Sequence, residues 1–281
     1  MLLGEHAVLH GRRALVCAID KRITVTLSPV NEKMLRINSA LGNYETPLDS
    51  LTDHPDFRFV LDAVKQYSPA HGIELNIESE FSSDIGFGSS AAVTVATHAA
   101  LIGSGENKNE IFKRSLATIH RVQGRGSGAD VAASVFGGVV AYRSAPLEIH
   151  LLSKAFPLTA VYSGAKMKTP AVIKIVETAR AAAPGKYETI FDEIDSCTGD
   201  TLNDISNLGS ALIKNQKLME EMKLNNAALD EIISAFRAAG VPSKISGSGL
   251  GDCAIGLGEF PSPEKYKTYP LKISLCGVNI E

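Results

Sequence analysis

The segment SDIGFGSSAAVTV, residues 83–95, carries the pattern best suited to holding an anion. Gly86 and Gly88 stand directly before Ser89 and Ser90, and a run of small residues typical of a helix follows. Glycine permits a sharp turn and a close approach of the backbone to a ligand. A helix that begins near Ser89 would direct unpaired N–H groups and the positive end of its dipole toward that turn. The pattern predicts a phosphate site, and a tight turn into a serine-capped helix is the simpler alternative.

Two further glycine-rich segments and one aspartate could act together with this segment. The first motif is GEHAVLHG (residues 4–11), and another glycine turn is SGSGLGDC (residues 246–253). The stretch GRGSGADVAAS (residues 124–134) places Asp130 at the predicted start of a helix, where the dipole favours an ionised carboxylate. Such a carboxylate could accept a hydroxyl proton or hold a cation, or it could only cap the helix. No Walker A loop and no clean G-x-G-x-x-G turn after a parallel strand occur, which disfavours P-loop and dinucleotide folds.

Composition and charge exclude several other classes of protein. The 281 residues carry a net charge of −3, and 44% of them are hydrophobic, which is typical of a globular chain. The charge balance predicts no nucleic-acid or membrane partner, and no apolar run approaches the roughly 20 residues that span a bilayer. The four cysteines are scattered without a C-x-x-C pair, so a reducing, cytoplasmic location is expected and a zinc site is not. No secretion signal is predicted at the start of the chain.

Hydrophobic periodicity predicts an irregular succession of strands and helices. Strands are expected at residues 13–29, 34–46, 72–81, 139–144, 148–152, 158–164, 244–258 (around a glycine turn) and 271–281. Helices are expected at residues 56–68, 89–103, 107–123, 130–138, 169–183, 187–195, 200–222 and 228–240. This order is typical of the α+β class rather than of regular β-α-β alternation. A boundary near residues 145–158 is expected to divide the chain into 1–150 and 151–281.

Taken in order, three segments resemble the three motifs of the GHMP kinases, the family of galactokinase, homoserine kinase, mevalonate kinase and phosphomevalonate kinase. The segments are GEHAVLHG, DIGFGSSAAV and KISGSGLGDC, and they span residues 4–258. The resemblance implies an N-terminal, ATP-binding domain like domain 2 of ribosomal protein S5 over residues 1–150. It implies a ferredoxin-like C-terminal domain over residues 151–281. It also implies an ATP-dependent kinase that uses Mg²⁺ and a small-molecule alcohol, and it allows a homodimer.

The first motif is similar to that of mevalonate kinases, which carry G-E-H-A-V-x-x-G. This similarity implies transfer of the γ-phosphate of ATP to the primary alcohol of mevalonate in isoprenoid biosynthesis. Residues 120–138 and 247–253 are instead similar to phosphomevalonate kinases. The phosphorylated acceptor of those enzymes calls for extra basic residues, which Arg125, Lys166 and Lys168 could supply. A non-catalytic homologue that binds nucleotide is the remaining alternative.

The resemblance assigns a role to each matching residue. Asp130 is implied to be the catalytic base that accepts the alcohol proton, and the Ser90 hydroxyl to be a Mg²⁺ ligand. Glu5, His6 and Thr169 are implied to lie near the acceptor. His6 could instead be a packed neutral histidine, and Thr169 a helix cap. The residues implied to contact ATP are Gly86, Phe87, Gly88, Ser89, Ser90, Ala91, Gly247 and Gly249.

Two positions depart from the family pattern. Mevalonate kinases carry a lysine a few residues before the G-E-H segment, and that position would here precede Met1. Either the chain begins at an internal methionine or this lysine is absent, and its absence is what supports the non-catalytic alternative. A glutamate that binds a second metal in many mevalonate kinases corresponds here to Ile119, beside His120. Neither side chain suits Mg²⁺, which prefers oxygen ligands, so the usual metal arrangement is in question.

Overall fold

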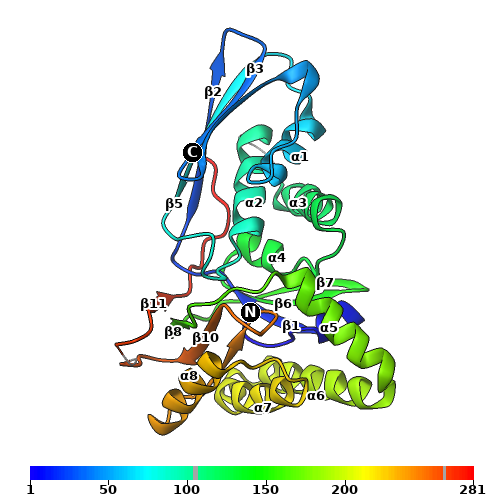
Figure 1. The fold of residues 1–281 in the computed structure, drawn as a ribbon, viewed down its shortest axis with the longest axis vertical. Coiled ribbons are helices and arrows are strands. Elements are labelled where there is room, and N and C mark those ends of the chain that lie inside the picture. Colours follow the sequence, from blue (N-terminus) through cyan, green and yellow to red (C-terminus); the bar gives the residue numbers. More distant parts are fainter. Residues whose placement is uncertain (104–106, 262–263) are drawn as a thin grey trace. The chain divides into compact units, whose positions relative to one another are not determined.

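Strands and helices follow one another irregularly along the chain, which confirms the α+β prediction. The computed structural model describes residues 1–103, 107–261 and 264–281, and it divides into two units (Figure 1). Unit 1 consists of Met1–Asp20, Asp84–Gly86 and Gly137–Leu275, and unit 2 of Lys21–Ser83, Phe87–Phe136 and Cys276–Glu281. Each unit thus gathers three separate stretches of the chain. The division at residue 150 stays a prediction about family domains.

In its described residues, unit 2 combines a four-stranded sheet with four α-helices. The sheet has the order β2-β5-β3-β4, from β2 (Ile23–Val30), β3 (Met34–Ser39), β4 (Gly42–Pro47) and β5 (Gly72–Ser79). Only β3 and β5 pair in parallel in this sheet. The helices are α1 (Arg58–Tyr67), α2 (Ser89–Ile102), α3 (Lys108–Gln123) and α4 (Ala129–Phe136), with the short 3-10 helix η2 (Leu48–Ser50) before them. Buried side chains of β3, β5 and α1, such as Ile37, Leu75 and Leu61, form the core between sheet and helix.

The described residues of unit 1 form two antiparallel sheets and a layer of helices. The three-stranded sheet, β1-β6-β7, is formed by β1 (Ala14–Cys17), β6 (Val139–Ser144) and β7 (Leu147–Leu152). The four-stranded sheet, β11-β8-β10-β9, is formed by β8 (Pro157–Tyr162), β9 (Ser243–Ser246), β10 (Cys253–Leu257) and β11 (Thr268–Lys272). The helices are η1 (Ala7–His10), α5 (Thr169–Ala182), α6 (Pro184–Asn203), η3 (Ile205–Asn207), α7 (Leu208–Glu221) and α8 (Ala227–Ala238).

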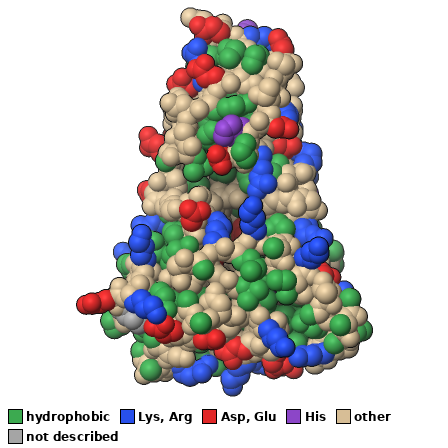
Figure 2. Space-filling model, viewed as in Figure 1, with side chains coloured by type: hydrophobic (Ala, Val, Ile, Leu, Met, Phe, Trp, Pro, Cys, Tyr) green, Lys and Arg blue, Asp and Glu red, His purple; other side chains and the backbone are tan. Residues whose placement is uncertain are grey.

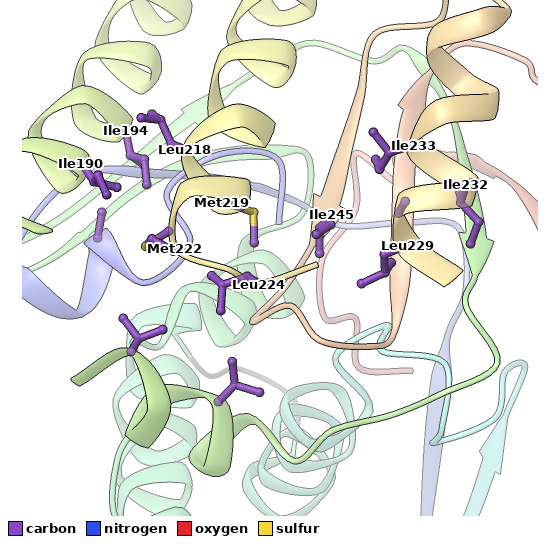
Figure 3. Packing of buried hydrophobic residues seen from close by; sticks show 14 of the residues in the cluster. Ile190, Ile194, Leu218, Met219, Met222, Leu224, Leu229, Ile232, Ile233 and Ile245 are labelled. Carbon is purple, nitrogen blue, oxygen red and sulfur yellow. The ribbon is translucent and has the colours of Figure 1, made fainter. Parts of the chain in front are cut away.

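The core of unit 1 joins its helices to β9. Figure 3 shows the buried side chains of α6, α7, α8 and β9 gathered in one cluster, with Leu224 between α7 and α8. The labelled members are Ile190, Ile194, Leu218, Met219, Met222, Leu224, Leu229, Ile232, Ile233 and Ile245. Burying one such side chain contributes about 1.5–3 kcal/mol. The cluster therefore fixes α7 against β9, the strand that leads into the glycine turn at residues 247–252.

The predicted helices at residues 187–195 and 200–222 are wrong in their bounds. One helix, α6, runs from Pro184 to Asn203 and covers the first tract and part of the second. Proline fits the first turn of a helix, where its missing N–H leaves no hydrogen bond unmade, so Pro184 begins α6. The helix α6 ends before Asp204, whose side chain accepts the N–H of Ser206 at 2.9 Å and caps the start of η3.

The strands predicted within residues 13–29 are confirmed as β1 in unit 1 and β2 in unit 2. The predicted strand at residues 271–281 is wrong in part. The last strand, β11, ends at Lys272. Beyond it, the N–H of Ser274 donates to the carbonyl of Ala18 at 3.0 Å, so the chain leaves the sheet to bond elsewhere in unit 1. Alternating apolar residues resemble a strand here, but their hydrogen bonds run to other segments.

The helices and the surface charges of the described residues can be compared with the prediction of no membrane and no nucleic-acid partner. No helix in residues 1–103, 107–261 and 264–281 is both long and apolar enough to cross a membrane. Figure 2 shows acidic and basic side chains interspersed with polar and apolar ones on the face that it draws. This mixture agrees with the small net charge of −3.

Candidate active site

The helix α2 begins after a glycine, which has no side chain to cap the first turn. Gly88 is the cap residue, with a left-handed backbone at φ 75°, and no side-chain hydrogen bond closes the first turn. Ser89 is the first helical residue, so the simpler alternative of a serine-capped helix is wrong. Gly86 has φ 77°, and a Cβ there would lie 2.6 Å from the Cβ of Asp252, so glycine is required. A helix start of this kind can face an anion.

Asp130 lies beside this helix start, within unit 2. It stands exposed in the first turn of α4. A Cβ built on Gly88 would lie 3.8 Å from the Cβ of Asp130 and 4.0 Å from its Oδ2. The structure therefore brings the carboxylate predicted to act as a base close to the glycine that caps α2.

The remaining residues of the predicted ATP segment differ in their surroundings. Phe87 lies near Phe81, with ring centroids 5.9 Å apart. Ala91 is buried in α2, whereas Ser90 is half-buried and its carbonyl accepts the hydroxyl of Thr94 at 2.6 Å. Ser90 thus belongs to the first turn of α2, on the same helix start as Gly88.

The position that holds a second metal-binding glutamate in related kinases is apolar here. Ile119 is buried in α3, and a Cβ on Gly126 would lie 3.0 Å from its Cγ2. The Nε2 of His120 lies 2.9 Å from the carbonyl oxygen of Gly126. Both side chains therefore lie against Gly126, in the loop before α4.

The first motif folds into a tight turn within unit 1. A Cβ on Gly4 would lie 2.5 Å from the Cα of Ala14, so the backbone there leaves no room for a side chain. Glu5 is 2% exposed and forms an ion pair with Lys244. His6 has φ 59°, and its Nε2–H donates to the carbonyl of Ser248 at 2.8 Å. Burial lowers the pKa of His6, so the imidazole is neutral near pH 7.

The third glycine turn, residues 247–252, joins β9 to β10 in unit 1. Gly247 and Gly249 have φ near 90°. A Cβ on Gly249 would lie 2.7 Å from the Cβ of Leu224, and the N–H of Leu250 donates to the Leu224 carbonyl at 2.7 Å. This turn is therefore held closely by the loop between α7 and α8, and its Ser248 carbonyl receives the His6 ring.

Thr169 and the candidate phosphate-binding cations are exposed. Lys168, not Thr169, caps α5, so Thr169 is the first helical residue and the helix-cap alternative is wrong. Arg125, Lys166 and Lys168 are all exposed. The structure shows no contact that brings Thr169 to Glu5 or His6, and its place near the acceptor stays a prediction.

Two residues of interest were not singled out by the sequence. Lys244 is fully buried, although it lies within a strand that reads as ordinary S-K-I-S. Asp252 has φ 59°, and its Oδ1 is buried with no hydrogen-bond partner in the described part of the chain. Burial raises the pKa of Asp252, while the charge of Lys166 opposes that rise. The S-K-I-S strand carries no local signal that its lysine would be buried, because two of the three other residues are polar.

Two family models match the chain. The model described as "GHMP kinases N terminal domain" matches residues 57–138, and the model described as "GHMP kinases C terminal" matches residues 194–267. The first range contains Gly86 to Ala91 and Asp130, and the second contains the third glycine turn.

Whole proteins and solved structures are similar over nearly the full chain. The mevalonate kinase of Archaeoglobus fulgidus is 34% identical over 289 residues, covering 100% of this chain and 96% of the relative. The mevalonate kinase of Pyrococcus furiosus is 28% identical over 308 residues, covering 99% and 91%. The crystal structure of the Methanococcus jannaschii mevalonate kinase matches with a TM-score of 0.82 at 23% identity, covering 97% of this chain and 95% of that one. The structural likeness concerns the fold, and the sequence likeness extends through both matched ranges.

Proposed function

Because the chain belongs to the GHMP kinase family, we propose that it is a mevalonate kinase, which transfers the γ-phosphoryl group of ATP to the primary alcohol of mevalonate. One observation carries the proposal: the carboxylate of Asp130 lies beside Gly88, at an uncapped helix start suited to phosphate. Phosphoryl transfer depends mainly on positioning and on neutralising charge, which such a site can supply. The relatives named mevalonate kinase support the choice of acceptor.

In this proposal the residues divide into a nucleotide side and an acceptor side. Backbone N–H groups of residues 86–91 bind the phosphates of ATP, and the turn at Gly247 and Gly249 contributes to the same substrate. Asp130 takes the proton from the alcohol while the alcohol oxygen bonds to the γ-phosphorus and ADP leaves. General-base help of this kind contributes on the order of 10²–10⁴-fold to a rate.

Glu5, His6 and Thr169 are the proposed acceptor-side residues. Since the Nε2–H of His6 already donates to Ser248, the neutral ring has its other nitrogen available as an acceptor for a hydroxyl group. Glu5 retains one buried carboxylate oxygen, Oε2, without a hydrogen-bond partner among the described residues. Both features suit a hydroxylated acceptor better than an apolar one.

Magnesium fits the oxygen atoms near the start of α2. In the part of the chain that the structure describes, no group of three or more His, Cys, Asp or Glu residues could hold a metal alone. Mg²⁺ commonly relies on one or two carboxylates together with substrate phosphates and water. Ser90 is the side chain that would hold it, with Asp130 nearby, and when bound it would neutralise charge on the phosphates.

We also propose a cytoplasmic location for the enzyme. None of the four cysteines, all of which the structure describes, is in a disulfide, which suits a reducing compartment. A homodimer stays a prediction from the family resemblance.

The proposal is tested by an acceptor panel. The purified chain is incubated with Mg·ATP and, separately, with mevalonate, phosphomevalonate, galactose or homoserine, and ADP is measured. We expect ADP with mevalonate alone. ADP only with phosphomevalonate would reverse the choice of acceptor, and ATP binding without turnover of any acceptor would favour a non-catalytic homologue.

A further inference from the structure

A buried ion pair lies beneath the first motif, within unit 1. Lys244 is fully buried, and its Nζ donates to Oε1 of Glu5, which is 2% exposed. The same ammonium group also donates to the carbonyl of Ile245. Lys244 therefore ties the first motif to β9, the strand that leads directly into the third glycine turn.

Two neighbouring side chains of α7 extend this connection. Asn215 Oδ1 accepts the N–H of Gly4 at 3.4 Å, and Gln216 Oε1 accepts the N–H of Ile245 at 2.8 Å. Both side chains are almost completely buried. Adjacent residues of one helix thus hold the first motif on one side and β9 on the other.

His6, the neighbour of Glu5 in the first motif, also connects this motif to the third glycine turn. Its backbone is in the left-handed region, at φ 59°, which side chains other than glycine rarely adopt. Its buried ring donates to the carbonyl of Ser248 in the third glycine turn. The residue next to Glu5 is therefore held in an uncommon conformation, against the turn that follows Lys244.

Packing alone does not account for this arrangement. Apolar side chains of similar volume often serve a core as well as a buried ion pair, because both charges must be taken out of water. Moreover, Glu5 Oε2 and Asn215 Nδ2 are buried without hydrogen-bond partners among the described residues. Buried polar atoms are usually paired, so each unpaired one calls for an explanation.

We propose that Lys244 is a positioning residue: by pairing with Glu5 it holds His6 in its positive-φ conformation against the third glycine turn. This inference rests on the proposed function, in which the first motif serves the acceptor and the third turn serves ATP. Lys244 itself touches neither substrate in this account. Its removal would free Glu5 and His6 from their fixed orientation.

The kinetic test replaces Lys244 by methionine. Lys217→Met is the matched control, because Lys217 is an exposed lysine on α7, next to Gln216. At a temperature where circular dichroism shows both variants folded, we expect Lys244→Met to raise the KM for mevalonate about tenfold to a hundredfold, with a smaller change in kcat. The control should match the wild type. An unchanged KM in folded Lys244→Met would overturn the proposal.

A second readout does not depend on turnover. In ¹⁵N-histidine NMR, the His6 signal is identified by its absence in His6→Asn. We expect this ring to resist protonation at pH 6 in the wild type and in Lys217→Met, and to titrate like an exposed histidine in Lys244→Met. A His6 signal that is the same in wild type and Lys244→Met would overturn the proposal. If the wild type does not phosphorylate mevalonate, the proposed function fails while this readout still decides the role of Lys244.

A double variant covers the case in which Lys244→Met does not fold. Combining Lys244→Met with Glu5→Gln removes both charges, so no unpaired buried charge remains. We expect the double variant to fold and still to show a released His6 ring. A wild-type His6 signal in the folded double variant would contradict the positioning role.

Discussion

Asp130 combines exposure with closeness to the start of a helix. Gly88, which caps α2, has no side chain, and a Cβ there would lie 3.8 Å from the Cβ of Asp130. Glycine at this position therefore does more than permit the turn, because it also leaves space beside the proposed base.

Asp130→Asn keeps the size of the side chain but removes its ability to accept a proton. We expect kcat to fall by about 10²–10⁴-fold while ATP still binds. Steady-state kinetics and calorimetric titration with ATP measure the two quantities. Asp49→Asn, an exposed aspartate paired with Lys33, is the control and should leave both unchanged. Wild-type turnover by Asp130→Asn would remove Asp130 from the mechanism.

Gly86→Ala tests the shape of the turn before α2. An alanine in the left-handed region costs about 1–2 kcal/mol wherever it is placed. At Gly86 the new Cβ would also lie 2.6 Å from the Cβ of Asp252, whereas at Gly240, with φ 70°, nothing lies within 4 Å. We therefore expect Gly86→Ala to weaken ATP binding and Gly240→Ala only to lower stability. Equal ATP affinity in the two variants would show that the turn does not shape the nucleotide site.

Among the elements, local signals located the helices that carry the site. The predicted starts at residues 89 and 130 agree with α2 and α4 to within one residue, because a glycine turn directly precedes each helix. The continuation of α6 through the tract after Cys197 had no such signal. Its buried face, with Ile190 and Phe191, packs into the core of unit 1, and this packing outweighs the local composition.

His98 links three helices of unit 2. In α2, its Nδ1 lies 3.2 Å from the hydroxyl of Tyr67 in α1, and its Nε2 lies 3.0 Å from the hydroxyl of Thr118 in α3. Burial lowers the pKa of His98 to about 4. The folded state therefore favours the neutral ring of His98, and protonation of this ring destabilises the fold.

The pH dependence of stability follows from this shift in pKa. Below about pH 6.5 the unfolded chain binds a proton at His98, while the folded chain does so only near pH 4. The free energy of unfolding therefore decreases as the pH is lowered from about 6.5 to about 4. From pH 8 to pH 5 the loss from this one group is about 2 kcal/mol. His98→Gln can still form hydrogen bonds but does not titrate, so urea unfolding should show a weaker pH dependence. The same pH slope in variant and wild type would contradict the prediction.

For the whole molecule, the pairings between residues far apart in the sequence could not be predicted from the sequence. Glu5 and Lys244 stand 239 positions apart, so no local pattern could indicate their pairing. The same holds for the bridge between Ile19 and Ile273, which helps to assemble unit 1 from distant stretches. The family resemblance identified the fold and the motifs, whereas the interleaving of the two units emerged only from contacts in space.

Phosphorylation of mevalonate is tested most directly by phosphorus NMR of the reaction with Mg·ATP. We expect a new phosphomonoester signal, coupled to the methylene protons of the primary alcohol and equal in amount to the ADP formed. With Asp130→Asn the signal should grow about 10²–10⁴-fold more slowly. Release of inorganic phosphate in place of that ester, or no product at all from mevalonate, would contradict the assignment of this chain as a mevalonate kinase.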